Sequence, residues 1–181
     1  MSATNDETLR RVSQPTYQNR LRVIGRQLDL GRFRAINLLE IGGGFLVRAL
    51  TSSNRLAEAL EFPHSEFRDS VARAIAARGE GERQHPAHPL LPTGYEDFLR
   101  ALGYRLDEQH AEAIAVTELE GFIAVSGVAK RDRISQTSIA PFQTLLRADD
   151  IVALLDEAFR RRGAPVPEPK PRQGLARRFR P

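Results

Sequence analysis

The chain has 181 residues, of which 41% are hydrophobic and 28% are charged, a composition typical of a folded globular protein. No apolar run approaches the roughly 20 residues needed to cross a bilayer, and the first residues lack the apolar stretch of a signal peptide. We therefore expect a cytoplasmic protein with no membrane contact. The absence of cysteine excludes disulfides, thiol catalysis and cysteine-bound metals.

The net charge of +4 is unevenly distributed. Residues 160–181 hold eight basic residues and one acidic residue, so this end carries +7 and the rest of the chain carries −3. We expect a mildly acidic folded body with a basic C-terminal end.

After a segment predicted to be flexible, residues 1–13, the chain contains two similar stretches. With a spacing of 78, nine positions are identical: Tyr17/Tyr95, Leu21/Leu99, Arg22/Arg100, Gly25/Gly103, Leu28/Leu106, Asp29/Asp107, Ala35/Ala113, Ile36/Ile114 and Glu40/Glu118. Such self-similarity indicates a tandem duplication. The predicted units are residues 14–79 and residues 95–163.

Each unit is predicted to begin with an amphipathic helix, because apolar residues recur at spacings of three and four from Tyr17 and from Tyr95. Gly25 and Gly103 lie on the apolar faces of these helices. A glycine inside a helix costs about 1 kcal/mol relative to alanine. Its presence in both copies predicts that another backbone, from the other helix or a facing sheet, approaches closely there.

A strand hairpin follows in each unit, joined by a glycine turn that we align as Gly44-Phe45 with Gly121-Phe122, one residue being lost in the second copy. The run of glycines at 42–44 also suggests a phosphate-binding loop. Such a loop leads from a strand into a helix, whereas this one leads into a strand, so a hairpin turn is the preferred interpretation. A third strand is predicted near residues 55–62 and 134–146.

A second helix closes each unit, at a spacing of 84 that pairs Phe67 with Ile151. Ser65 and Asp149 are the predicted N-caps, and Gly79 and Gly163 the predicted ends. Residues 80–94, rich in glycine and proline, form the predicted linker. The expected fold is α+β: a duplicated helix–strand–strand–(strand)–helix unit, packed as an intramolecular pseudo-dimer because each half is too small for a sizeable core of its own.

Residues 164–181 form a proline-rich basic tail, expected to be extended at its prolines. We interpret it as a docking peptide for an acidic surface, or alternatively as a solubilising end. Its candidate partner-binding residues are Lys170, Arg172, Leu175, Arg177, Arg178, Phe179 and Arg180.

The paired carboxylates allow two interpretations. Because Arg22 and Arg100 also recur, the preferred one is structural ion pairs, Glu40 with Arg22 and Glu118 with Arg100. The alternative is that the two glutamates meet at a twofold axis, where they would bind a metal or share a proton. Asp29 and Asp107 are placed near helix C-termini, where a negative charge is unfavourable.

Other chemistry-bearing residues give weaker signals. His85 and His88 are interpreted as solvated linker residues rather than zinc ligands, because no third ligand follows at a diagnostic spacing. Ser126-Gly127 has no convincing base beside it. We therefore expect no catalytic residues, no metal and no cofactor.

The predicted element order resembles double-stranded RNA-binding domains. That family carries a basic cluster at the start of its second helix. At the matching positions this chain has His64-Ser65-Glu66 and Ala148-Asp149-Asp150, and these acidic starts argue against RNA binding by the fold itself. The order is also similar to the small secretion-chaperone fold, a twofold dimer, which implies a single-chain pseudo-dimer here. No site residue is transferred from either family.

From these features we expect a non-enzymatic protein-interaction adaptor or assembly subunit whose tail docks on an acidic protein surface. The alternative is a protein associated with the RNA or DNA backbone through its arginine-rich tail. A third possibility is an enzyme that uses Glu40 and Glu118.

Overall fold

The computed structural model describes residues 16–67, 69, 88–133 and 136–161. Within these residues the chain forms one six-stranded antiparallel sheet with strand order β3-β2-β1-β4-β5-β6. The α+β class is thus confirmed. The predicted closing helix of the first unit, the residue range 164–181 and most of the linker lie outside the described residues.

Three α-helices and one short 3-10 helix accompany the sheet in the described part of the chain. The helices are α2 (Tyr17–Leu30), α4 (Gly94–Glu108) and α5 (Ala148–Arg160), and η1 is the 3-10 helix (His64–Glu66). The strands are β1 (Arg34–Ile41), β2 (Gly44–Leu50), β3 (Leu60–Pro63), β4 (Ala111–Leu119), β5 (Phe122–Arg133) and β6 (Gln136–Leu146). None of the described helices is long and apolar enough to span a membrane.

Helices α2 and α4 cross at the two glycines singled out in the sequence. A Cβ atom at Gly25 would lie 2.5 Å from the carbonyl oxygen of Tyr95, and one at Gly103 would lie 2.6 Å from the carbonyl oxygen of Tyr17. These distances are too short for a real Cβ contact. The prediction of a close backbone approach is therefore confirmed, and the partner is the other helix.

The hairpin turns correct one detail of the sequence alignment. Glu40 pairs with Phe45 across the first hairpin, and Glu118 pairs with Ile123 across the second. The spacing of 78 therefore continues through both turns, and no residue is lost. Matching the two Gly-Phe pairs was wrong, because it put sequence identity ahead of the two-residue turn that both hairpins share. The glycines at 42–44 join strand to strand, as the preferred interpretation expected.

A bulge interrupts the same place in β1 and β4. Ala35 and Ala113 both have a φ of 51°, and the strand register shifts between Arg34 and Asn37 and between Glu112 and Ala115. A left-handed backbone is unusual for alanine and persists only where surrounding contacts impose it. The bulge leaves the amides of Ile36 and Ile114 available to side chains from the other strand.

The start of α5 also differs from the prediction. The helix begins at Ala148 after Arg147, whose backbone N–H donates to the Asp150 carboxylate at 2.9 Å. Asp149 therefore lies inside the first turn and is not the N-cap. Ser65 lies within η1, whose N-cap is Pro63.

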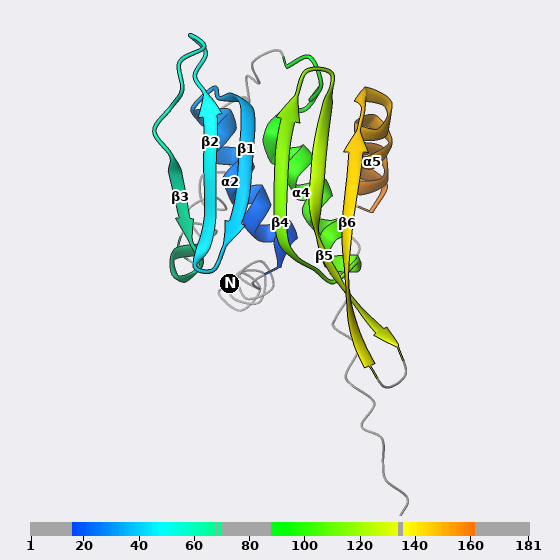
Figure 1. The fold of residues 1–181 in the computed structure, drawn as a ribbon. Coiled ribbons are helices and arrows are strands. Elements are labelled where there is room, and N and C mark those ends of the chain that lie inside the picture. The colour runs from blue at the N-terminus through cyan, green and yellow to red at the C-terminus, as the bar shows by residue number, and fades with distance from the viewer. Residues whose placement is uncertain (1–15, 68, 70–87, 134–135, 162–181) are drawn as a thin grey trace, which may run out of the picture.

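The core lies between the sheet and the helices. In Figure 1 the helices stand behind the sheet, and no described helix covers the face toward the viewer. Along β1 and β4, Ile36, Leu38, Ile114 and Val116 are buried, and their side chains point toward α2 and α4. Alternate residues such as Leu39 and Leu119 point to the other side, which we call the open face.

Candidate functional site

A layer of polar contacts joins the residues that recur in both halves of the chain. Asp107, at the end of α4, accepts hydrogen bonds from the backbone N–H groups of Tyr17 and Gln18 at 2.8 and 2.9 Å. Asp29, at the end of α2, accepts from those of Tyr95 and Glu96, both at 2.9 Å. Each aspartate thus caps the N-terminus of the opposite helix, where a negative charge is favourable. The sequence predicted that each aspartate interacts unfavourably with the dipole of its own helix. In the structure each one instead binds the N-terminus of the opposite helix.

Burial raises the pKa of Asp107, and the two backbone hydrogen bonds oppose that rise. The amides of the opposite helix are thus the main groups that favour the ionised Asp107 carboxylate, and the charges of Arg20 and His110 act in the same direction. This is the chemistry of a helix cap.

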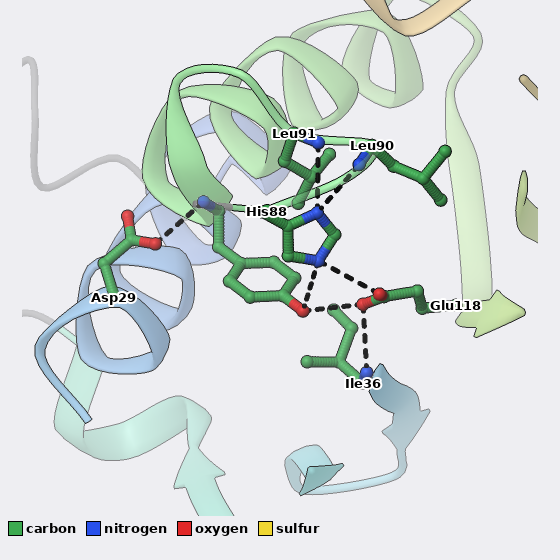
Figure 2. A network of polar contacts seen from close by, with 7 residues as sticks. Asp29, Ile36, His88, Leu90, Leu91 and Glu118 are labelled. Atoms are coloured by element: carbon green, nitrogen blue, oxygen red, sulfur yellow. Dashed lines mark hydrogen bonds and ion pairs between the residues drawn. The ribbon is translucent and has the colours of Figure 1, made fainter. Parts of the chain in front are cut away.

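Glu118 occupies the centre of a second cluster, drawn in Figure 2. Its Oε2 accepts from the Tyr95 hydroxyl at 2.6 Å and from the Ile36 amide at 3.2 Å, and its Oε1 lies 3.0 Å from His88 Nε2. Burial alone would raise the pKa of Glu118, but the hydrogen bonds from His88 and Tyr95 outweigh it and hold the pKa below its usual range. Burial and the adjacent carboxylate raise the pKa of Tyr95. The carboxylate is thus ionised and the phenol neutral.

His88 is fixed at both ring nitrogens. Its Nδ1 accepts from the backbone N–H groups of Leu90 and Leu91 at 3.1 and 3.0 Å, so Nε2 carries the proton that points to Glu118. The side chain is 7% exposed. The prediction of a solvated linker histidine was wrong for His88, because residues 88–91 form a turn that places the ring against the Tyr95 hydroxyl. His85 lies outside the described residues.

Glu40 has the matching position in the first half. Its Oε2 accepts from the Tyr17 hydroxyl at 2.5 Å and from the Ile114 amide at 3.1 Å. The histidine here is His64, whose Nε2 lies 4.0 Å from Glu40 Oε1, too far for a hydrogen bond. Burial, followed by the charge of Arg20, lowers the pKa of His64. Burial and the hydrogen bond to Glu40 raise the pKa of Tyr17.

These contacts overturn the predicted ion pair of Glu40 with Arg22. Arg22 Nε lies 3.0 Å from Glu96 Oε1 instead, a buried carboxylate with no counterpart in the sequence repeat. For Glu118, the partners found are a phenol, an imidazole and an amide, and no bond to Arg100 is among them. Sequence identity showed which positions mattered but not their partners.

The two glutamates also do not meet as a pair. Leu38 pairs with Val116 at the centre of the β1–β4 contact, and the strands run in opposite directions. Glu40 and Glu118 therefore lie on opposite sides of this centre, about 13 Å apart along the strands. Among the described residues no group of three or more histidines and carboxylates could hold a metal ion. The shared-proton and shared-metal alternatives lose their geometric basis.

The open face carries features that the sequence did not predict. Large apolar side chains remain uncovered there: Leu39 (41% exposed), Ile41 (51%), Leu119 (46%) and Leu145 (55%). The sequence signal for this exposed apolar surface was that apolar residues occur on both faces of β1 and β4. The candidate binding residues of the tail lie outside the described residues, and their role remains a prediction.

No protein-family model, curated protein or solved structure matches this chain.

Proposed function

We propose that the chain is a tandem duplication folded as an intramolecular pseudo-dimer. Three observations support this proposal: the nine identities at a spacing of 78 between residues 17–40 and 95–118, the reciprocal caps of Asp29 and Asp107, and the pairing of Leu38 with Val116, which are themselves 78 residues apart. Under this proposal a pseudo-twofold axis passes between Leu38 and Val116.

We further propose that the protein is a non-enzymatic adaptor or assembly subunit that binds a protein partner. The observation that carries this proposal is the open face, where four large apolar side chains are each at least 41% exposed. Several large apolar side chains exposed on one face of a folded protein are typical of an interaction site. The strands between these residues contribute small or neutral side chains, among them Ala115, Thr117, Ala124 and Ser126. Arg48, which pairs with Asn37, adds a cation on the β2 side of this face, but the named positions of β4 and β5 carry none, which suits a protein partner better than a phosphate backbone.

The interior polar clusters support the non-enzymatic part of the proposal. The Glu118 carboxylate and the His88 ring are bonded to groups of the folded body itself. A catalytic group must instead reach the atoms of a substrate. Their arrangement fits a structural role in joining the two halves.

The basic tail is proposed as a second contact, which docks on an acidic surface of the same partner through the arginines at 172, 177, 178 and 180 and through Lys170. Leu175 and Phe179 are its proposed apolar anchors. A tethered second contact raises the overall affinity without enlarging the first one.

The test compares full-length protein with three variants: Leu39→Lys on the open face, Leu56→Lys as a matched control, and a chain ending at Gly163. Leu56 is 69% exposed but lies in the loop between β2 and β3. Each is used to capture partners from its native lysate with and without nuclease, and any captured protein is then purified and titrated.

We expect one protein that survives nuclease, that loses at least about tenfold in affinity on Leu39→Lys and is unchanged by Leu56→Lys. Loss of affinity on truncation would add the tail as a contact. A nucleic acid retained by the Leu39→Lys variant and released steeply by salt would replace the proposal with the nucleic-acid alternative.

A further inference from the structure

The open face carries large side chains next to small ones. Leu39 on β1 pairs with Leu46 on β2, and residues directly opposite each other in a sheet point to the same side. On its other flank Leu39 pairs with Ala115 on β4, and Ala115 pairs in turn with Ser126 on β5. At this level of the sheet the face is therefore high over β1 and β2 and low over β4 and β5.

The charges on this face balance. Among the open-face strand positions whose side chains are described, the register places Arg48 and Glu61 near the β3 edge. It places Arg34 and Glu112 beyond the bulges of β1 and β4, again one charge of each sign. A second copy of the same face therefore brings no net charge against the first, whereas a strongly acidic or basic partner surface would find no matching excess.

The edges of the sheet are less suited to association than its face. Edge strand β3 has only four residues and ends in Pro63, and edge strand β6 contains Pro141. Short edge strands and prolines are features that hinder the addition of further strands. Association by extension of the sheet is thus disfavoured, and the open face is the better surface.

We propose that the open face binds the open face of a second copy of this chain, related by a twofold axis that runs along the strands between β1 and β4. This rotation places β1 of one copy over β4 of the other, and β2 over β5. Leu39 then lies over Ala115 of the second copy. Leu46 likewise lies over Ser126 of the second copy. Each contact occurs twice, because a twofold interface is self-complementary.

The alternative twofold axis, directed across the strands, is less favourable. It would place β2 over β2, with Leu46 of one copy over Arg48 of the other, because these residues lie on opposite sides of the level of Leu38. A guanidinium group would then be buried against a leucine without a partner, which is costly. The axis along the strands leaves Arg48 toward the β3 edge, where it belongs to the polar rim typical of an interface.

The open face is large enough for such a contact. Six strands at about 4.8 Å spacing make the sheet roughly 24 Å across, and the seven residues of β2 extend about 23 Å. The flat area is then about 550 Å² per copy, to which the relief of the side chains adds. A specific interface typically buries about 800 Å² per partner. Two sheets packed face to face about 10 Å apart, as in a β-sandwich, therefore meet the size of a stable dimer.

This inference rests on the proposed function, since it takes the open face to be a protein-binding surface and names the partner there. The charge of the chain is consistent with it. Residues 160–181 carry +7 and the rest of the chain carries −3, so a second copy also offers the opposite charge that the basic tail is proposed to bind.

The first experiment measures the molar mass of the purified full-length chain by analytical ultracentrifugation over a range of concentrations. We expect twice the mass of one chain. Leu39→Lys should raise the dimer Kd at least about tenfold, and Leu56→Lys, in the exposed loop between β2 and β3, should leave it unchanged. A chain that is monomeric at every concentration, or a dimer indifferent to Leu39→Lys, would overturn the proposal.

The second experiment exchanges a large and a small side chain. Ser126→Leu should raise the dimer Kd at least about tenfold, because it sets leucine against Leu46 of the other copy. Adding Leu46→Ser to the same chain should restore the affinity, since the pair is then exchanged. Ser126→Leu also adds apolar surface, so non-specific association would instead become tighter. A tighter dimer, or no recovery in the double variant, would overturn the proposed arrangement.

These outcomes separate this inference from the adaptor proposal. A monomeric chain whose Leu39→Lys variant still loses a different captured protein would remove the dimer and leave the adaptor. A dimer that fails the Leu39→Lys and Ser126→Leu tests would also remove the inference. A dimer that passes both tests but captures no other protein would retain the inference and remove the adaptor's outside partner.

Discussion

Leu38 on β1 faces Val116 on β4, and both side chains are fully buried at the point where the two halves of the sheet join. The same spacing of 78 that separates these two residues separates the aspartates that cap the helices and the tyrosines that bind the glutamates. Many contacts therefore occur twice in one molecule. A substitution in one half has a natural comparison in the other.

The close crossing of α2 and α4 predicts that alanine is poorly tolerated at either glycine. We expect Gly25→Ala and Gly103→Ala each to lower the free energy of unfolding by about 1–3 kcal/mol, because the added Cβ meets backbone atoms that cannot move aside singly. Gly42→Ala is the control, since nothing lies within 4 Å of a Cβ there. Denaturant unfolding of the three variants checks this. A Gly25→Ala variant with an unchanged free energy of unfolding would contradict the close approach of α2 and α4 at this glycine.

The reciprocal caps predict a second matched pair. Asp29→Ala and Asp107→Ala should each destabilise the protein by about 0.5–2 kcal/mol, the range for loss of an N-cap side chain. Asp156→Ala, at an exposed site on α5, should change stability by less than about 0.5 kcal/mol. Thermal and denaturant unfolding measure all three. If Asp29→Ala matched Asp156→Ala, the caps would have no energetic role.

The Tyr95–Glu118 hydrogen bond predicts non-additive energetics. Tyr95→Phe should destabilise the wild-type protein by about 1.5–3 kcal/mol, because the hydroxyl donates to an ionised acceptor. In a Glu118→Gln background the same substitution should matter less, with a coupling energy of about 0.5–3 kcal/mol. A double-mutant cycle by denaturant unfolding measures this coupling. Strict additivity would show that the bond contributes nothing.

The lowered pKa of Glu118 predicts a loss of stability in acid. Since the folded state favours the ionised carboxylate, its contribution is fully present above the usual glutamate value of 4.5 and is lost as pH falls through the folded pKa. The raised pKa of Asp107 acts in the opposite sense, because its folded state favours the proton. We expect the unfolding free energy to fall less steeply below pH 4.5 in Glu118→Gln than in wild type. Parallel curves would argue against the assignment.

The lowered pKa of His64 predicts a separate effect at higher pH. Its folded state favours the neutral ring, so stability should decrease as pH falls below the usual histidine value of 6.5. His64→Gln should flatten the stability profile in that range. Nuclear magnetic resonance titration of the His64 ring provides the direct measurement, and an unshifted midpoint would contradict the prediction.

The sequence predicted the elements whose signals are local. Apolar spacing located α2 and α4, and the recurrence of Gly25 and Gly103 identified the place where they touch. It failed where the partner is set by three-dimensional packing. The glutamates bind tyrosine hydroxyls and bulge amides because the two strands run in opposite directions, and nothing in the local pattern reveals this.

The linker histidine illustrates the same limit. His88 lies between Pro86 and Pro89 in a segment of low hydrophobicity, which predicts exposure. Its burial depends on a turn whose backbone amides donate hydrogen bonds to the ring, and on a carboxylate thirty residues later in the chain. Likewise, the open face became visible only once the strands had been assigned to one sheet.

The reciprocal contacts have a consequence for synthesis of the protein. Glu40 and Asp29 leave the ribosome long before the backbone amides of Ile114 and Tyr95 that they bind. At about 5–20 residues per second, the first half waits roughly 4–15 seconds for those partners. During that interval α2 lacks its contact with α4 and β1 lacks its contact with β4, so the apolar side chains that these contacts bury stay exposed longer than those within either half.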